Sequence, residues 1–184
     1  RKILGVVGSG NNGADVLAAL RLLGGKFDCF AFLASDKQNE TSKTELTRAL
    51  KCGVNLISNL TESGEFDCII DGIFGTGLSR ELDAQTINLI NTLNATPAYK
   101  LACDIPSGLD KNGVPQGAVF KADTTVTMGA LKLALYSDFA KDCVGCVKVA
   151  NLGLPRELYE TQTSFYKLSK NDLNLPFRAK QNVN

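Results

Sequence analysis

The sequence Gly8-Ser9-Gly10-Asn11-Asn12-Gly13-Ala14-Asp15 follows the apolar run Ile3–Val7 and leads into a helical pattern over residues 12–25. Glycine permits a sharp turn and a close backbone approach to a ligand, and a helix N-terminus offers unpaired N–H groups to an anion. The three glycines fit the G-x-G-x-x-G spacing of a dinucleotide-binding turn in its proper strand-to-helix context. That fingerprint requires neither two carboxamides nor a carboxylate, so this turn is predicted to serve polar chemistry as well as phosphate binding.

Strand and helix signals alternate outward from this turn. Short apolar or β-branched runs are typical of strands, and a 3.6-residue apolar period is typical of helices. Near-continuous apolar strands alternating with helices indicate a mostly parallel sheet covered on both faces. The sequence therefore predicts an α/β fold, a three-layer αβα Rossmann-like domain. The expected strands are 3–7, 27–33, 54–57, 67–73, 98–103, 124–128 and 146–150, and the expected helices are about 12–25, 41–53 and 83–95, the last capped by Asp83.

Composition excludes several classes of function. The net charge of +1 comes without a basic run, which argues against nucleic acid or a membrane surface as a partner. No apolar stretch approaches the roughly 20 residues of a membrane-spanning helix. The chain has no histidine, so Ser-His-Asp and Cys-His catalysis are excluded and acid–base work falls to other side chains. Cysteines inside strand-like runs, with only a lone Cys143-x-x-Cys146 pair, predict a reduced, cytoplasmic protein.

Polar loops with glycines follow four of the expected strands. They cover residues 8–15, 71–81, 104–110 and 128–132. Because the carboxyl ends of parallel strands lie at one edge of a sheet, these loops are predicted to converge on a binding site. A carboxylate at the end of a central strand is costly to bury unless it is paired, hydrogen-bonded or bound to a cation. Asp71 and Asp104 therefore suggest a metal or a ligand hydroxyl, whereas Lys132 fits a phosphate partner or a solvated surface lysine equally well.

These loops carry a resemblance to a known family. The motifs GSGNNGAD, DGIFGTGLSREL, DIPSGLD, ADTTVTMGALK and VKVANLGLP, in this order from Lys2 to about Pro155, resemble the NAD(P)H-hydrate epimerase family. The resemblance implies an isomerase whose small-molecule substrate is NADH or NADPH hydrated at C6 of the nicotinamide ring. It would interconvert the R and S hydrates, so that a stereospecific dehydratase can repair both.

The resemblance also implies the residues of the site. Oxygen ligands for K+ would come from Asn12, Asp71 and Ser107, a donor set that suits a hard cation. Asp104 is expected to be the acid–base residue. Asp15 is second, because a helix N-terminus should keep it ionised. The substrate-binding residues would be Asn11, Asn12, Gly13, Ala14, Asp15, Gly75, Thr76, Gly77, Leu78, Ser79, Arg80, Glu81 and Asp104.

The extent of the domain and its departures from the family pattern give further expectations. Residues 1–168 are predicted to form the epimerase-like domain, and 169–184 a linker or tail toward a dehydratase domain. The sequence lacks the helical segment that usually precedes the first strand and helps to form the pocket and the dimer in relatives. A homo-oligomer and a fused or partner dehydratase are expected. Ala14 and Val16 stand where the family commonly has glycines, so their side chains are expected to crowd the phosphate approach.

Two other classes of function remain open. A conventional NAD(P)-dependent dehydrogenase would use the same glycine turn, and Asp36 sits near the sequence position of a ribose-binding acid. The Asn-Asn pair, the short length and the missing substrate domain weigh against it. A non-catalytic nucleotide-binding or scaffold domain of the same fold is the third class, and the intact Asp104 and the polar turn weigh against that.

Overall fold

The computed structural model describes residues 1–158, 165–168 and 172–173. The chain divides into two units, Arg1–Leu154 and Pro155–Asn184, and the first contains the whole sheet. The second begins with a single 3-10 turn, η2 (Arg156–Leu158). Apart from residues 172 and 173, the predicted tail at 169–184 lies outside the described residues, and the domain boundary at 168 stays a prediction.

All seven expected strands and all three expected helices are present, with ends within a few residues of those predicted. A short 3-10 helix, η1 (Leu133–Tyr136), was not expected, because four residues are too few to show a period. Asp83 caps the third helix as predicted, its side chain accepting a hydrogen bond from Thr86 N at 2.8 Å. The elements are β1 (Lys2–Val7), α1 (Asn11–Leu23), β2 (Asp28–Leu33), α2 (Glu40–Lys51), β3 (Asn55–Ile57), β4 (Cys68–Gly72), α3 (Ala84–Ala95), β5 (Tyr99–Cys103), β6 (Thr124–Met128) and β7 (Cys146–Ala150).

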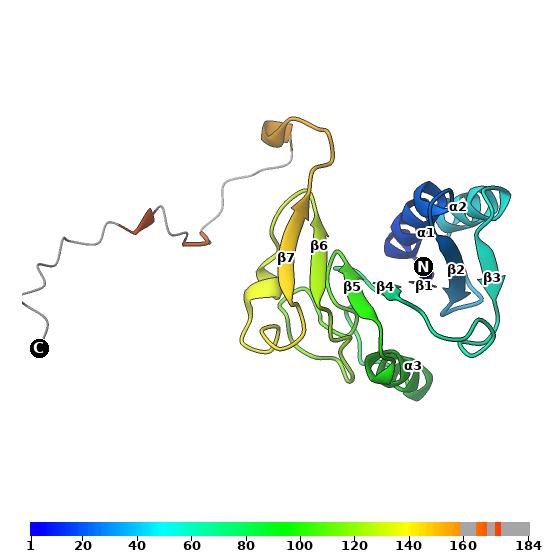
Figure 1. The fold of residues 1–184 in the computed structure, drawn as a ribbon. Helices are drawn as coiled ribbons and strands as arrows, with labels where there is room; N and C mark the ends of the chain where they lie inside the picture. The colour runs from blue at the N-terminus through cyan, green and yellow to red at the C-terminus, as the bar shows by residue number, and fades with distance from the viewer. Residues whose placement is uncertain (159–164, 169–171, 174–184) are drawn as a thin grey trace, which may run out of the picture. The chain divides into compact units, whose positions relative to one another are not determined.

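The strands form one sheet in the order β3-β2-β1-β4-β5-β6-β7, and every neighbouring pair is parallel. The chain moves outward from β1 through β2 to β3 and then returns to place β4 on the other side of β1 (Figure 1). In an open parallel sheet, this reversal leaves a crevice beyond the carboxyl ends of the two central strands. The loops after β1 and β4 flank that crevice.

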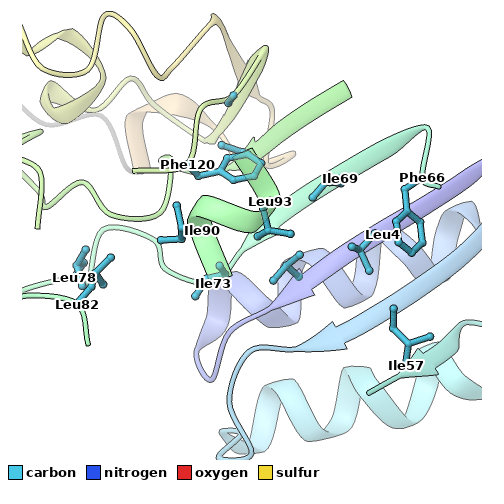
Figure 2. Packing of buried hydrophobic residues seen from close by; sticks show 13 residues of the cluster. Leu4, Ile57, Phe66, Ile69, Ile73, Leu78, Leu82, Ile90, Leu93 and Phe120 are labelled. Atoms are coloured by element: carbon cyan, nitrogen blue, oxygen red, sulfur yellow. The ribbon is translucent and has the colours of Figure 1, made fainter. Parts of the chain in front are cut away.

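Helices cover both faces of the sheet, which confirms the three-layer αβα fold. Helices α1 and α2 lie on one face, and α3 lies on the other (Figure 1). Successive side chains of β1 alternate between the two layers, as in any strand: Ile3 and Val7 pack with α1, whereas Leu4 and Val6 belong to the core under α3. Figure 2 shows that second core on the α3 face of the sheet, with Leu4, Phe66, Ile69, Ile73, Ile90, Leu93 and Phe120 among its residues.

Two long connections join the last three strands of the sheet. Residues between β5 and β6, and between β6 and β7, form a third small core around Ile105, Leu109 and Leu135. This core holds η1, which directly follows the fourth predicted loop. Among the described residues, no helix combines the length and apolar character needed to cross a membrane.

Candidate functional site

A cavity of about 820 Å³ opens at the carboxyl ends of β1, β4, β5 and β6. Each of the four predicted loops contributes to its wall, so their convergence is confirmed. Its lining residues are Ser9, Gly10, Asn11, Asn12, Asp15, Ile73, Phe74, Gly75, Thr76, Gly77, Leu78, Ser79, Arg80, Asp104, Met128 and Lys132.

Most of the expected substrate-binding residues line this cavity, and three do not. Gly13 is buried under the turn, where a Cβ would lie 2.3 Å from the carbonyl oxygen of Gly8. Ala14 is buried in the core, and Glu81 is exposed outside the cavity wall. The structure therefore brings together Asn11, Asn12, Asp15, Gly75–Arg80 and Asp104.

Asp104 has an unusual backbone conformation at the end of β5. Its φ of 68° is the only positive value at a non-glycine position within the described part of the chain. Such a conformation costs energy for an L-residue and is often found at functional sites. The neighbouring structure holds it, because Asp104 N donates to the carbonyl of Val126 at 2.8 Å. The turn directs the carboxylate to the cavity instead of along the sheet.

Lys132 contacts this carboxylate directly. Its ammonium lies 2.8 Å from Oδ1 of Asp104, and both side chains are largely buried, at 24% and 14% exposure. The phosphate and solvent interpretations left open by the sequence are therefore replaced by an ion pair within the cavity. The sequence indicates this ion pair only by placing Lys132 in a loop that follows a strand. The distance between that loop and Asp104 is set by the fold.

Asp15 is the second acid of the cavity. The pKa of its carboxyl is raised above the usual range, first by burial and second by the negative charge of Asp104. The expectation that the helix N-terminus would keep Asp15 ionised is not supported. Asp15 is the fifth residue of α1, beyond the first turn to which the dipole effect is confined. Two carboxyl groups thus interact across one cavity.

Asp71 lies just below the cavity and is fully buried. Its Oδ1 accepts hydrogen bonds from Ser107 Oγ at 2.6 Å and Ile73 N at 3.1 Å, and its Oδ2 accepts one from Ser107 N at 2.8 Å. Burial raises the pKa of the Asp71 carboxyl to about 6, although these hydrogen bonds oppose the shift. The side chain joins the loop after β4 to the loop after β5.

Asn12 joins the same group of residues through the carbonyl of Phe74. Its Nδ2 donates to that oxygen at 2.8 Å, and Ser107 Oγ lies 3.3 Å from it. Asn12 and Ser107 thus meet at one backbone carbonyl, and Asp71 is joined to them through its hydrogen bonds with Ser107. Within the described ranges, no cluster of three His, Cys, Asp or Glu residues could hold a metal ion. A site here would consist mainly of neutral oxygens, which suits a weakly charged hard cation.

Similarity to known proteins identifies the family of this chain. Residues 1–134 match the family described as "YjeF-related protein N-terminus". An NAD(P)H-hydrate epimerase of Oenococcus oeni is 35% identical over 158 residues, covering 84% of this chain and 75% of that protein. The chain belongs to the NAD(P)H-hydrate epimerase family. A relative named bifunctional NAD(P)H-hydrate repair enzyme Nnr, from Helicobacter pylori, is 37% identical over 186 residues.

The coverage of these family members differs. The match includes 99% of this chain but only 40% of the Helicobacter pylori enzyme, so the chain spans less than half the length of that relative. The crystal structure of yeast ynu0 superposes with a TM-score of 0.65 at 19% identity, over 73% of this chain and 60% of that one. That likeness shows the shared fold.

The side chains that replace the family's glycines do not enter the cavity. Val16 is fully buried: a Cβ built on Gly5 would lie 2.7 Å from it, and one built on Gly72 would lie 2.5 Å from it. Its isopropyl group fills the space above these two strand glycines. Ala14 is 3% exposed and also belongs to the core. The predicted crowding of the phosphate approach is therefore wrong, because both side chains point below the site.

The acidic residue that would support a dehydrogenase does not lie at the cavity. Asp36 is exposed and does not line the cavity, so it is not placed to hold a ribose there. Relatives that match most of this chain are named epimerases. The cysteine pair provides no chemistry at the site either, since neither Cys143 nor Cys146 lines the cavity.

Proposed function

We propose that this chain interconverts the R and S forms of NADH or NADPH hydrated at C6 of the nicotinamide ring. The observation that carries the proposal is a cavity at the switch point of an epimerase-family domain, with two acids and no histidine. A hydride transfer would need a second substrate to give up or accept the hydride, and nothing in this cavity requires that chemistry. An exchange of the C6 hydroxyl needs only a proton donor and acceptor beside the ring.

The reaction is a balanced exchange of water. Asp104 transfers a proton to the C6 hydroxyl oxygen, the C6–O bond breaks, and water leaves with the electron pair. The lone pair of ring N1 forms the N1=C6 bond of a planar iminium. Water then adds to the opposite face and returns a proton to the carboxylate. General acid–base catalysis of this kind contributes about 10²–10⁴-fold to a rate.

Asp15 supports this proton transfer. Because its pKa is raised by burial and by the Asp104 charge, it holds a proton more readily than an ordinary aspartate. Two interacting carboxyl groups share their protons as a pair, and different surroundings give them different roles. Asp15 therefore helps to keep a proton within the pair, and Asp104 is the member of the pair that delivers it to the reacting oxygen.

The phosphates of the substrate have a separate place in the cavity. Helix α1 begins at the cavity with Gly10 as its N-cap, and no side chain caps its first turn. Its free N–H groups and the Arg80 guanidinium fit the pyrophosphate of a dinucleotide. This orientation leaves the nicotinamide ring for the Asp104 side of the cavity.

A direct assay tests the proposed function. The purified protein is mixed with one separated epimer of hydrated NADH, and the other epimer is followed by chromatography against the spontaneous background. Interconversion with no change in oxidation state supports the proposal. NADH formation from NAD+ with a hydroxy acid would support a dehydrogenase, and binding of the hydrate without turnover would support a scaffold domain.

K+ is proposed to bind at Asn12, Asp71 and Ser107, with the Phe74 carbonyl as a fourth oxygen. The fit rests on the hydrogen bonds that bring the oxygens of Asp71, Ser107 and Phe74 together and on the buried carboxylate of Asp71. Asn12 reaches the same carbonyl through its amide nitrogen, so its amide would have to turn its oxygen toward the cation. A bound cation would neutralise that carboxylate and fasten the loops after β1, β4 and β5 to one another. It would act on the shape of the cavity, while the proton transfers stay with Asp104 and Asp15.

The K+ proposal predicts a cation-specific gain in thermal stability. At a K+ concentration 100 times its dissociation constant, the gain in unfolding free energy would be about 2.7 kcal/mol. Melting curves in KCl and in choline chloride of equal ionic strength measure it. Ser107→Ala keeps the Asp71 carboxylate but removes one ligand, and it should reduce the K+ gain, whereas Asp36→Asn should keep it. Equal melting temperatures in both salts for the wild type would contradict a K+ site.

The partners follow from the family and remain proposals. A dehydratase, fused to this domain or separate, is expected to consume the epimer that this domain produces, consistent with bifunctional relatives. A homo-oligomer is also proposed. Six free cysteines fit a reducing, cytoplasmic location.

A further inference from the structure

We propose that Lys132 is a positioning residue for the epimerisation: it fixes one carboxylate oxygen of Asp104, so that only the other oxygen meets the substrate. The inference rests on the proposed function and names a residue whose role the sequence left open. It follows from the unequal surroundings of the two oxygens of Asp104.

Oδ1 of Asp104 is fully engaged by the protein. It accepts hydrogen bonds from Thr127 Oγ1 and from Met128 N, each at 3.2 Å, and lies 2.8 Å from Lys132 Nζ. All three donors come from the end of β6 or the loop that follows it. Lys132 is the one charged donor of the three and makes the shortest contact, so it holds this oxygen most strongly.

Oδ2 has different surroundings. Among the described residues, no donor hydrogen-bonds to it, and it lies 3.5 Å from the position that a Cβ on Gly75 would occupy. Gly75 lines the cavity, as does Asp104 itself. This oxygen is therefore the one left to exchange a proton with the substrate. Rotation of the carboxylate would break the three contacts of Oδ1.

Lys132 is itself held firmly. Its ammonium also donates to the carbonyl of Met128, and its own carbonyl accepts a hydrogen bond from Leu135 N at 3.1 Å. It is the N-cap of η1, whose Ala134 and Leu135 are buried in the third core. A lysine bound at both ends loses little further freedom when it orients a neighbour. An exposed phosphate-binding lysine would not need this support.

The test is a set of four proteins: wild type, Lys132→Met, Asp104→Asn and the double variant. Lys132→Met keeps the length of the side chain without its charge. It should lower kcat by about 10–100-fold, the scale of a small misplacement of a reacting group, with little change in KM. If Lys132 acts through Asp104, adding Lys132→Met to Asp104→Asn should lower the rate no further. Lys132→Arg should restore part of the activity.

Each other outcome overturns the proposal. A rise in KM that multiplies with the effect of Asp104→Asn would make Lys132 a phosphate ligand. Equal losses in Lys132→Arg and Lys132→Met, together with a lower melting temperature in both, would make its role structural. Lys141→Met, which removes an exposed surface ion pair, is the matched control and should react like wild type. The wild-type rate alone decides the proposed function, whereas ratios among the four proteins decide the role of Lys132.

Discussion

Asp104→Asn is expected to lower the rate of R/S interconversion by about 10²–10⁴-fold while the protein remains folded. Asparagine tolerates the left-handed backbone at φ 68° better than other non-glycine residues, so the loop should keep its conformation. Its amide oxygen can still accept the hydrogen bonds from Thr127 and Met128. The variant loses the ability to take up and return a proton, which isolates the chemical role. Initial rates on each separated epimer measure it.

The control for this experiment lies at the same edge of the sheet. Asp36→Asn changes an acid of the loop after β2 that is exposed and outside the cavity. It should react like wild type and melt at the same temperature. If Asp104→Asn interconverts the epimers at a near-normal rate, Asp104 is not the acid–base residue. Asp15→Asn would then be the next variant, since Asp15 is the other acid that lines the cavity.

The fold was predictable because local and global signals agree in this sequence. Each strand is a short apolar or β-branched run, and α2 and α3 each start at a side chain that caps the helix. The convergence of four loops also followed from the sequence, since parallel strands all place their carboxyl ends at one edge. What the pattern could not give was the short helix η1, which has too few residues to show a period.

The details of the site depend on distances that only the fold sets. Asp104 and Lys132 lie in different loops, and no local pattern indicates that they pair. The positive φ of Asp104 was not predictable, because this conformation is uncommon outside glycine. From its place in the glycine motif, Val16 is expected to crowd the phosphates. Its side chain instead packs onto Gly5 and Gly72, which lie in two strands beneath it. The pKa of Asp15 likewise depends on burial, which the glycine motif does not report.

Gly8→Ala is expected to lower the free energy of unfolding by about 3 kcal/mol, the upper end of the usual cost of overpacking and a large share of the stability of an ordinary domain. A Cβ at Gly8 would lie 1.9 Å from the carbonyl oxygen of Ile73, and backbone cannot move as cheaply as a side-chain tip. Gly8 N also donates to the carbonyl of Gly72 at 3.0 Å, so the clash falls where the loops after β1 and β4 are joined. Urea unfolding measures the loss.

Gly10→Ala is the matched comparison, because no atom lies within 4 Å of a Cβ built at Gly10. As the N-cap of α1, alanine there should cost less than about 1 kcal/mol. Gly10 lines the cavity, so the added methyl group should instead weaken substrate binding if the phosphates approach this backbone. The two glycines would then have separate tasks: Gly8 lets the two loops meet, and Gly10 leaves room for the ligand. Equal losses of stability in both variants would contradict this division, since the first clashes with backbone and the second meets open space.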